Sequence, residues 1–167
     1  MSIPSLRTDE EISSIYNRYV DTVYRISLMM LKHRAEAEDA TSTVFIKLIT
    51  AGTSFENDEH LKAWLIVAAQ STCKDMLKSR WFSRRTDYES IEEPSYLPDN
   101  FAKEIWEEVV ALDEKYKLPI YLHYYEGYKT EEIAAMLKVN HATVRTRLRA
   151  AKKKLKLLLE FDRGGQV

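Results

Sequence analysis

The stretch KTEEIAAMLKVNHATVRTRLRAAKKKLKLLL, from Lys129 to Leu159, decides the fold class of this chain. Its spacing predicts a short helix, a tight turn and a second helix with one apolar and one basic side. On a helical wheel of about 100° per residue, the apolar residues of the second helix form one stripe. The stripe contains Val144, Leu148, Ala151 and Leu155. This is the layout of a helix-turn-helix, in which the second helix enters the major groove of DNA.

The polar side of the second helix carries the candidate DNA contacts. An arginine near the start of such a helix can donate two hydrogen bonds to guanine, while threonine hydroxyls and the first amides can hold phosphates. Later lysines add an attraction that depends on salt and not on base sequence. The predicted contacts are Asn140, His141, Thr143, Arg145, Thr146, Arg147, Arg149 and Lys153, with Arg145, Thr146 and Arg149 as the base readers. Charge alone fits a solvated basic face equally well; the preceding helix and turn favour DNA.

The charge of the chain is uneven, although its net value is only -1. Residues 62–86 carry six basic and one acidic residue, whereas residues 87–114 carry one basic and ten acidic residues. Residues 141–167 carry eight basic and two acidic residues. Two basic segments on either side of an acidic one predict two cationic surfaces and a solvated spacer.

Helical periodicity dominates the rest of the chain, and no alternating run of useful length predicts a strand. The predicted helices span residues 12–30, 35–49, 59–80, 101–112 and 118–125, with a polar break at 50–58. In the helix at 59–80 the expected buried stripe is Leu61, Leu65, Ala68, Thr72 and Met76. Pro119 suits a first helical turn, and Thr130 and Asn140 suit N-caps. We therefore expect an all-α protein.

The domain organisation follows from an acidic segment with two prolines, Pro94 and Pro98, and no helical stripe. Such a segment is typical of a linker between domains. The expected division is a first helical domain at 1–82, a linker at 83–100, a helix-turn-helix domain at 101–160 and a mobile tail at 161–167.

Several classes of protein are disfavoured. No secretory signal is visible at the N-terminus, and no run of apolar residues is long enough to insert in a membrane. The single cysteine, Cys73, is typical of a packing residue in a reducing cytosol. We therefore expect a cytoplasmic protein. The four histidines lack metal-ligand spacing, and no phosphate loop or nucleophile elbow is present. The sequence therefore predicts no enzyme, no metal site and no cofactor.

Short motifs in both halves resemble one known family. The segments PIYL at 119–122, EGY at 126–128, TEEIA at 130–134 and TVRTRL at 143–148 resemble region 4 of bacterial RNA polymerase sigma factors. The segments AEDA at 37–40, VF at 44–45, LKAWL at 61–65 and KDML at 74–77 resemble region 2 of the same factors. The order and spacing of these motifs are similar to those of the small extracytoplasmic-function (ECF) group of the sigma-70 family.

The resemblance implies a function for each domain. The first would bind core RNA polymerase, through Asp39, Ser42, Thr43 and Phe45, and would capture unstacked bases of the −10 promoter element. The candidates for that capture are Phe55, Asn57, Glu59, His60, Lys62, Lys74, Lys78 and Arg80. The second domain would read the −35 element as duplex, and the linker would thread through the polymerase. The family commonly works under an anti-sigma factor, so such a partner is implied by the resemblance.

This chain departs from the family pattern at a few positions. Relatives often carry Gln-Glu at the positions of Ser42 and Thr43. An Arg-Asn pair is frequent at the positions of Gln70 and Ser71. A His-Arg or Phe-Arg pair is common at the positions of Arg149 and Ala150. Lys138 replaces the usual turn glycine, at a cost of about 1 kcal/mol in a left-handed turn.

Alternatives to the sigma-factor interpretation remain open. A stand-alone helix-turn-helix regulator would bind duplex DNA without polymerase, and an adaptor would bind polymerase without DNA. The run Tyr121, Tyr124, Tyr125 and Tyr128 could stack on bases, but its spacing is more typical of packing between helices. Trp64 is assigned to packing, while Trp81 and Phe82, close to two arginines, are open candidates for DNA contact.

Overall fold

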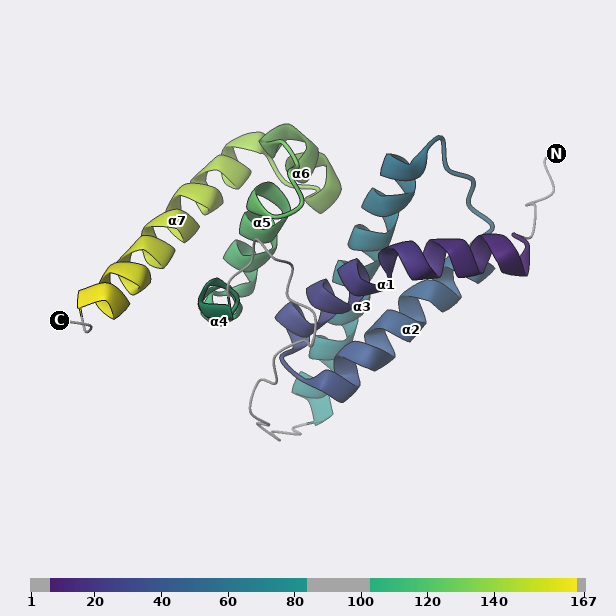
Figure 1. Ribbon diagram of the computed structural model, residues 1–167, viewed down its shortest axis with the longest axis horizontal. Helices are drawn as coiled ribbons and strands as arrows, with labels where there is room; N and C mark the ends of the chain where they lie inside the picture. Colours follow the sequence, from purple (N-terminus) through teal and green to yellow (C-terminus); the bar gives the residue numbers. More distant parts are fainter. Residues whose placement is uncertain (1–6, 84–102, 165–167) are drawn as a thin grey trace. The chain divides into compact units, whose positions relative to one another are not determined.

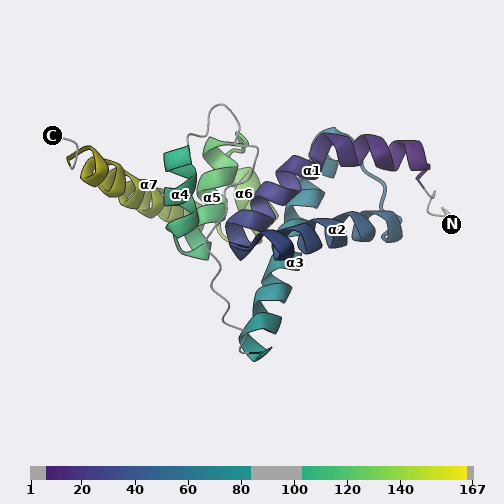
Figure 2. The same ribbon diagram turned by 60° about the horizontal axis from the view of Figure 1, so that its bottom comes forward.

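The computed structural model describes residues 7–83 and 103–164 (Figures 1 and 2). The chain divides into two compact units, residues 1–94 and 95–167. Every regular element of the described residues is a helix, which confirms the expected all-α class. The helices are α1 (Asp9–Leu31), α2 (Arg34–Thr50), α3 (Asp58–Ser83), α4 (Lys103–Ala111), α5 (Glu114–Tyr124), α6 (Thr130–Leu137) and α7 (His141–Gly164).

The first unit is a three-helix bundle in which α1, α2 and α3 all pack on one another (Figure 1). Helix α1 begins three residues before the predicted start because Thr8 and Glu11 form a capping box: the Glu11 amide donates to Thr8 Oγ1 at 3.1 Å, and the Thr8 amide donates to Glu11 Oε2 at 3.4 Å. Its last residue is Leu31, and Lys32, a left-handed residue with φ of 57°, follows as the C-cap. The face of α2 that points into the bundle consists of Ala37, Ala40, Val44, Phe45 and Leu48, all buried.

The buried face of α3 differs from the predicted stripe. Its fully covered residues are Leu61, Leu65, Ile66, Ala69, Thr72 and Cys73, whereas the predicted Ala68 and Met76 are partly exposed. The face is rotated because α3 packs against both α1 and α2, so its buried side is wider than a single stripe. Lys47 Nζ donates to Thr72 Oγ1 at 2.8 Å, which ties α2 to this face.

The second unit contains α4 to α7, with α7 packed against α4, α5 and α6. The predicted stripe of α7 is confirmed, because Val144, Leu148 and Ala151 are buried and Leu155 is half-buried. Its partners in the core include Trp106, Val109, Leu118, Tyr121, Leu122 and Ile133. Burying this stripe leaves the opposite side of α7 outside the core.

Two predicted helix starts in this unit were wrong. Helix α5 begins at Glu114, so Pro119 lies inside it and leaves the Lys115 carbonyl without its intrahelical donor. The burial of Leu118 and Leu122 on either side of the proline offsets that loss. Thr130 is the first residue of α6 and not its cap: the cap position is Lys129, whose amide donates to the Glu132 carboxylate at 3.1 Å.

The last helix extends beyond the predicted end of the second domain at residue 160. Helix α7 runs to Gly164, through the first residues of the expected tail at 161–167. Lysine and leucine, which favour helix, fill the preceding segment, and glycine commonly ends a helix. The described residues include neither 165–167 nor the part of the expected linker that follows Ser83. Ser83 itself is the last residue of α3.

Lys138 provides a test of backbone strain in the helix turn. It has φ of 55° and its amide donates to the Ala134 carbonyl, so a left-handed residue closes α6. We expect Lys138→Gly to raise the free energy of unfolding of the second unit by about 1 kcal/mol, because glycine adopts this conformation without steric cost. Hydrogen exchange of buried α7 amides in denaturant would measure it.

Lys32 supplies a matched control, because it has the same left-handed conformation at the end of α1, in the other unit. Lys32→Gly should stabilise the first unit and leave α7 exchange unchanged. A loss of stability in the Lys138→Gly variant would contradict the strain argument.

Candidate nucleic-acid interface

The outward face of α7 brings together four of the predicted DNA contacts. Arg145, Thr146, Arg149 and Lys153 are all exposed, opposite the buried stripe. The Thr146 hydroxyl donates to the Ala142 carbonyl at 2.9 Å, which leaves its oxygen able to accept a hydrogen bond. Three cations and one hydroxyl on a single exposed helix face can donate to base edges and phosphates.

The other predicted contacts on α7 occupy different positions. Arg147 and Thr143 are half-buried, and Arg147 lies on the wheel about 60° from the buried stripe, away from the outward face. Asn140 is exposed and precedes the helix as predicted, and its carbonyl accepts from the Val144 amide at 3.2 Å. The structure therefore separates Arg147 from the candidate base readers.

His141 makes a contact within the unit that the sequence did not indicate. Its Nε2 lies 2.6 Å from Thr130 Oγ1, in a hydrogen bond that joins the first residue of α6 to the first residue of α7. His141 is half-buried there, so part of its imidazole packs within the unit and is not available for the DNA contact expected of it. The bond spans the helix-turn-helix and constrains the angle between its two helices.

Two lysines on the flanks of α7 cover tyrosines of α5. Lys152 Nζ lies 5.0 Å from the ring centroid of Tyr124, and Lys154 Nζ lies 4.4 Å from that of Tyr116. Tyr124 remains 53% exposed, so the expectation that the tyrosines pack in the core holds for Tyr121 and not for Tyr124. No sequence signal pairs residues this far apart; the cation–π contacts arise from the way α7 lies on α5.

In the first unit, three of the four predicted polymerase contacts share an exposed face of α2. Asp39, Ser42 and Thr43 are exposed, and the Thr43 hydroxyl donates to the Asp39 carbonyl at 2.9 Å. Phe45 is placed differently: it is 5% exposed and packs edge-on against Tyr16, with ring centroids 4.9 Å apart. Phe45 belongs to the bundle and offers no surface for a direct contact.

Sequence reasoning missed two apolar residues on α2. Ile46 is 58% exposed and Ile49 is 44% exposed. They follow Thr43 at intervals of three residues, so they continue the face that begins with Asp39. The helical spacing of Asp39, Thr43 and Ile46 could have shown this, since the buried residues of α2 occupy the other side.

The loop at 51–57 and the start of α3 contain those predicted −10 contacts that lie close to one another in sequence. Asn57 caps α3: its Oδ1 accepts from the His60 amide at 2.8 Å. His60 Nδ1 accepts from the Glu56 amide at 3.2 Å, and Phe55 packs edge-on against His60 and against Trp64, with centroids 5.2 and 5.7 Å apart. Glu59 is exposed beside them.

The predicted cations along α3 do not form one cluster. Lys74 and Lys78 are exposed one turn apart, on the same face, whereas Lys62 is half-buried about 18 Å away along the axis. The side chain of Arg80 lies outside the described residues, as do those of Trp81 and Phe82. The candidate −10 surface therefore has two parts, the loop with the start of α3, and the Lys74–Lys78 face.

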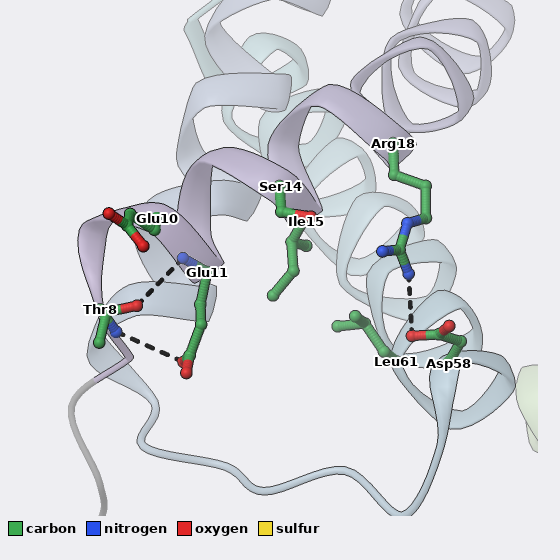
Figure 3. A pocket seen from close by; sticks show the side chains of 8 residues that line it. All are labelled: Thr8, Glu10, Glu11, Ser14, Ile15, Arg18, Asp58 and Leu61. Carbon is green, nitrogen blue, oxygen red and sulfur yellow. Dashed lines mark hydrogen bonds and ion pairs between the residues drawn. The ribbon is translucent and has the colours of Figure 1, made fainter.

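A hollow of about 640 Å³ lies between α1 and the start of α3 (Figure 3). Arg18 crosses it to Asp58, with Nη1 and Oδ1 2.9 Å apart, and a hydrogen bond to Tyr19 and the Asp58 charge raise the pKa of Arg18. Glu10 and Glu11 also line the hollow. It holds no predicted DNA contact, and its three carboxylates disfavour phosphate.

Within residues 7–83 and 103–164, no helix is long and apolar enough to cross a membrane. Over the same ranges, no three His, Cys, Asp or Glu side chains are grouped as ligands for a metal ion.

Two family descriptions match this chain, one in each unit. The description "Sigma-70 region 2" matches residues 15–83, and "Sigma-70, region 4" matches residues 102–155. The chain is 30% identical over 138 residues to the RNA polymerase sigma factor SigV of Bacillus subtilis, covering 81% of this chain and 83% of SigV. It is 24% identical over 169 residues to the ECF RNA polymerase sigma factor SigX of the same organism, covering 91% and 87%.

Solved structures show the same fold. The sigma factor RpoE of Bartonella quintana, crystallised with the anti-sigma factor NepR, has a TM-score of 0.71 at 20% identity, covering 92% of this chain and 99% of that one. CnrH, solved with the cytosolic domain of CnrY, has a TM-score of 0.67 at 19% identity, covering 93% and 91%.

The hydrogen bond between Thr130 and His141 is testable by a double-mutant cycle. Thr130→Val and His141→Ala should each lower the free energy of unfolding of the second unit, and the double variant should lose about 1 kcal/mol less than the two losses added together, since both remove one bond. Denaturant-dependent hydrogen exchange of α7 amides would measure all three. Thr130→Ser keeps the hydroxyl and is the control; strictly additive losses would contradict the coupling.

Proposed function

Because this chain belongs to the sigma-70 family of RNA polymerase sigma factors, in the ECF group, and directs RNA polymerase to promoters, we propose that its two units divide this task. The second unit reads the −35 element as duplex DNA. The first unit binds core polymerase and captures bases of the −10 element as the strands open. Phe45 and Arg147 are not assigned direct contacts in this scheme, because one is buried and the other lies off the outward face.

The observation that carries the proposal is the outward face of α7. Arg145, Arg149 and Thr146 are exposed on it near the start of the helix, where a recognition helix meets base edges. Lys153 continues the face one turn later and is suited to a phosphate. Lys152 and Lys154, held over tyrosines on the flanks, add positive charge without reaching the centre of the face.

The exposed face of α2 is the proposed polymerase contact. Asp39, Ser42 and Thr43 supply polar groups at one end, and Ile46 and Ile49 supply apolar surface at the other. Because each isoleucine is already about half covered, burying the rest of it in a complex would contribute about 1 kcal/mol. A face that combines charge with exposed apolar side chains is typical of a protein interface.

The loop at 51–57 with the start of α3 is the proposed site of −10 capture. Unstacking a base costs a few kcal/mol, and stacking on an aromatic ring returns about 1–3 kcal/mol. Phe55 in the loop and His60 at the start of α3 present ring surface, and Lys74 and Lys78 offer charge for the strand along α3. In this role the protein is a DNA-binding initiation factor and not an enzyme.

The setting of the protein follows from this role. We place it in the cytoplasm, where polymerase and promoter DNA are found. The solved relatives RpoE and CnrH are each bound to another protein, RpoE to the anti-sigma factor NepR. We propose an anti-sigma factor for this chain too, because the exposed isoleucines of α2 need cover when polymerase is absent.

Transcription from purified core polymerase tests the whole proposal. Adding the protein should give promoter-dependent initiation, and Asp39→Arg should reduce both initiation and core affinity by about tenfold, since a contact of 1.4 kcal/mol corresponds to that factor. Asp21→Arg, an equal charge change on an exposed position of α1, is the control. Duplex binding without core, and no initiation with it, would instead indicate a stand-alone regulator.

The role of α7 is testable by separating base reading from charge. Arg145→Ala and Arg149→Ala should each cost about 1–3 kcal/mol on a preferred −35 duplex and relax its sequence preference. Lys153→Ala should weaken all sequences alike and lower the slope of log K against log salt by about 1. Holoenzyme titrations with labelled duplexes at several salt concentrations would measure both. Lys154→Ala, on the flank of α7, is the comparison. An equal loss of affinity for every variant on every DNA sequence would contradict base reading.

A further inference from the structure

An arginine that precedes the first helix connects the end of α2 to two parts of the loop at 51–57. Arg7 Nη1 donates to the Leu48 carbonyl at 3.3 Å, Arg7 Nη2 donates to the Thr53 carbonyl, and its guanidinium carbon lies 5.0 Å from the centroid of the Phe55 ring. These partners are more than 40 residues away in sequence. One side chain therefore holds the end of α2, the middle of the loop and the ring of Phe55 together.

The contact at Leu48 has a clear physical reason. Leu48 lies in the last turn of α2, where carbonyl groups lack intrahelical donors. A guanidinium supplies donors and positive charge at the end of the helix where the macrodipole is negative. Its planar fork also has a second group of donors left for Thr53, which a lysine ammonium could not place in the same geometry.

The far end of the loop is held by other groups from α1 and α3. Asp58, the residue after the loop, pairs with Arg18 at 2.9 Å, and its carbonyl accepts from the Tyr19 hydroxyl at 3.5 Å. The side chain of Asn57 caps α3 at the same place. Figure 3 shows Arg18 reaching from α1 to Asp58, so the N-terminal part of the chain contacts the loop region at both ends.

We propose that Arg7 is a positioning residue that orders the loop before DNA arrives. This inference rests on the proposed function of the loop in −10 capture. A loop that became ordered only on meeting the strand would spend part of its binding free energy on that ordering. Because Arg7 holds the loop backbone and the Phe55 ring in the free protein, the ring is already placed when a base leaves the stack.

Hydrogen exchange of the free protein tests the ordering directly. In Arg7→Ala the amides of residues 51–57, including that of Glu56, should exchange about tenfold faster, while amides in the core of α1 to α3 stay unchanged. Arg34→Ala, which removes an equal charge from an exposed ion pair at the other end of α2, is the control and should leave the loop unchanged. Unchanged loop exchange in Arg7→Ala would overturn the inference.

Promoter opening by the holoenzyme tests the consequence. Arg7→Ala should slow permanganate-detected opening of the −10 element by about tenfold, with core affinity and closed-complex affinity within about twofold of the original. Arg7→Lys keeps the charge and should slow promoter opening almost as much, because one ammonium cannot hold both carbonyls. A merely destabilised protein would lose core affinity as well.

Phe55→Ala separates this inference from the function on which it rests. Slow opening by Phe55→Ala together with normal opening by Arg7→Ala would overturn the inference and leave −10 capture by the loop standing. Normal opening by both variants would overturn the proposed function of the loop and the inference with it. Slow opening by both, with faster loop exchange only in Arg7→Ala, supports the inference.

Discussion

The burial of one stripe of α7 is the constraint on which the DNA-binding surface depends. Val144, Leu148 and Ala151 are enclosed by the neighbouring helices, and an α-helix has no freedom to rotate once such a stripe is buried. The opposite side, with Arg145 and Arg149, is thereby turned outward. The same packing leaves lysines on both flanks, where they cover tyrosines of α5. Packing and recognition in this helix are therefore two results of one orientation.

In the first unit, too, the burial of one side of a helix decides which residues face solvent, and this unit carries two candidate surfaces, the exposed face of α2 and the loop that follows it. Because Phe45 and Leu48 are buried in the bundle, α2 must present Asp39, Ile46 and Ile49 to solvent. The loop that follows α2 is ordered by polar contacts together with the ring contacts of Phe55. The polar contacts come from the segment around the start of α1 and from the cap of α3. A docking face and a capture loop thus share one small bundle.

Local sequence signals predicted the helices well, but predicted less well which of their residues are buried and where each helix begins. The helical stripes, the turn and the acidic segment were enough to predict an all-α chain with a helix-turn-helix. Pro119 was misplaced because packing of its neighbours outweighs a missing hydrogen bond. The α3 face was misplaced because two partner helices widen it, and Phe45 was assigned to polymerase although it packs against Tyr16. Each error concerns a preference that tertiary packing overrides.

The sequence by itself determined which segments are helices and which side of α7 is basic, because a period of 3.6 residues fixes the face on which each residue lies. It could not determine which distant groups meet. The bond between Thr130 and His141 and the contacts of Arg7 join residues whose separation has no relation to helical periodicity. Such contacts exist only after the helices have packed, since packing sets the distances between their ends. For that reason the tertiary structure alone decided how the turn and the loop are held.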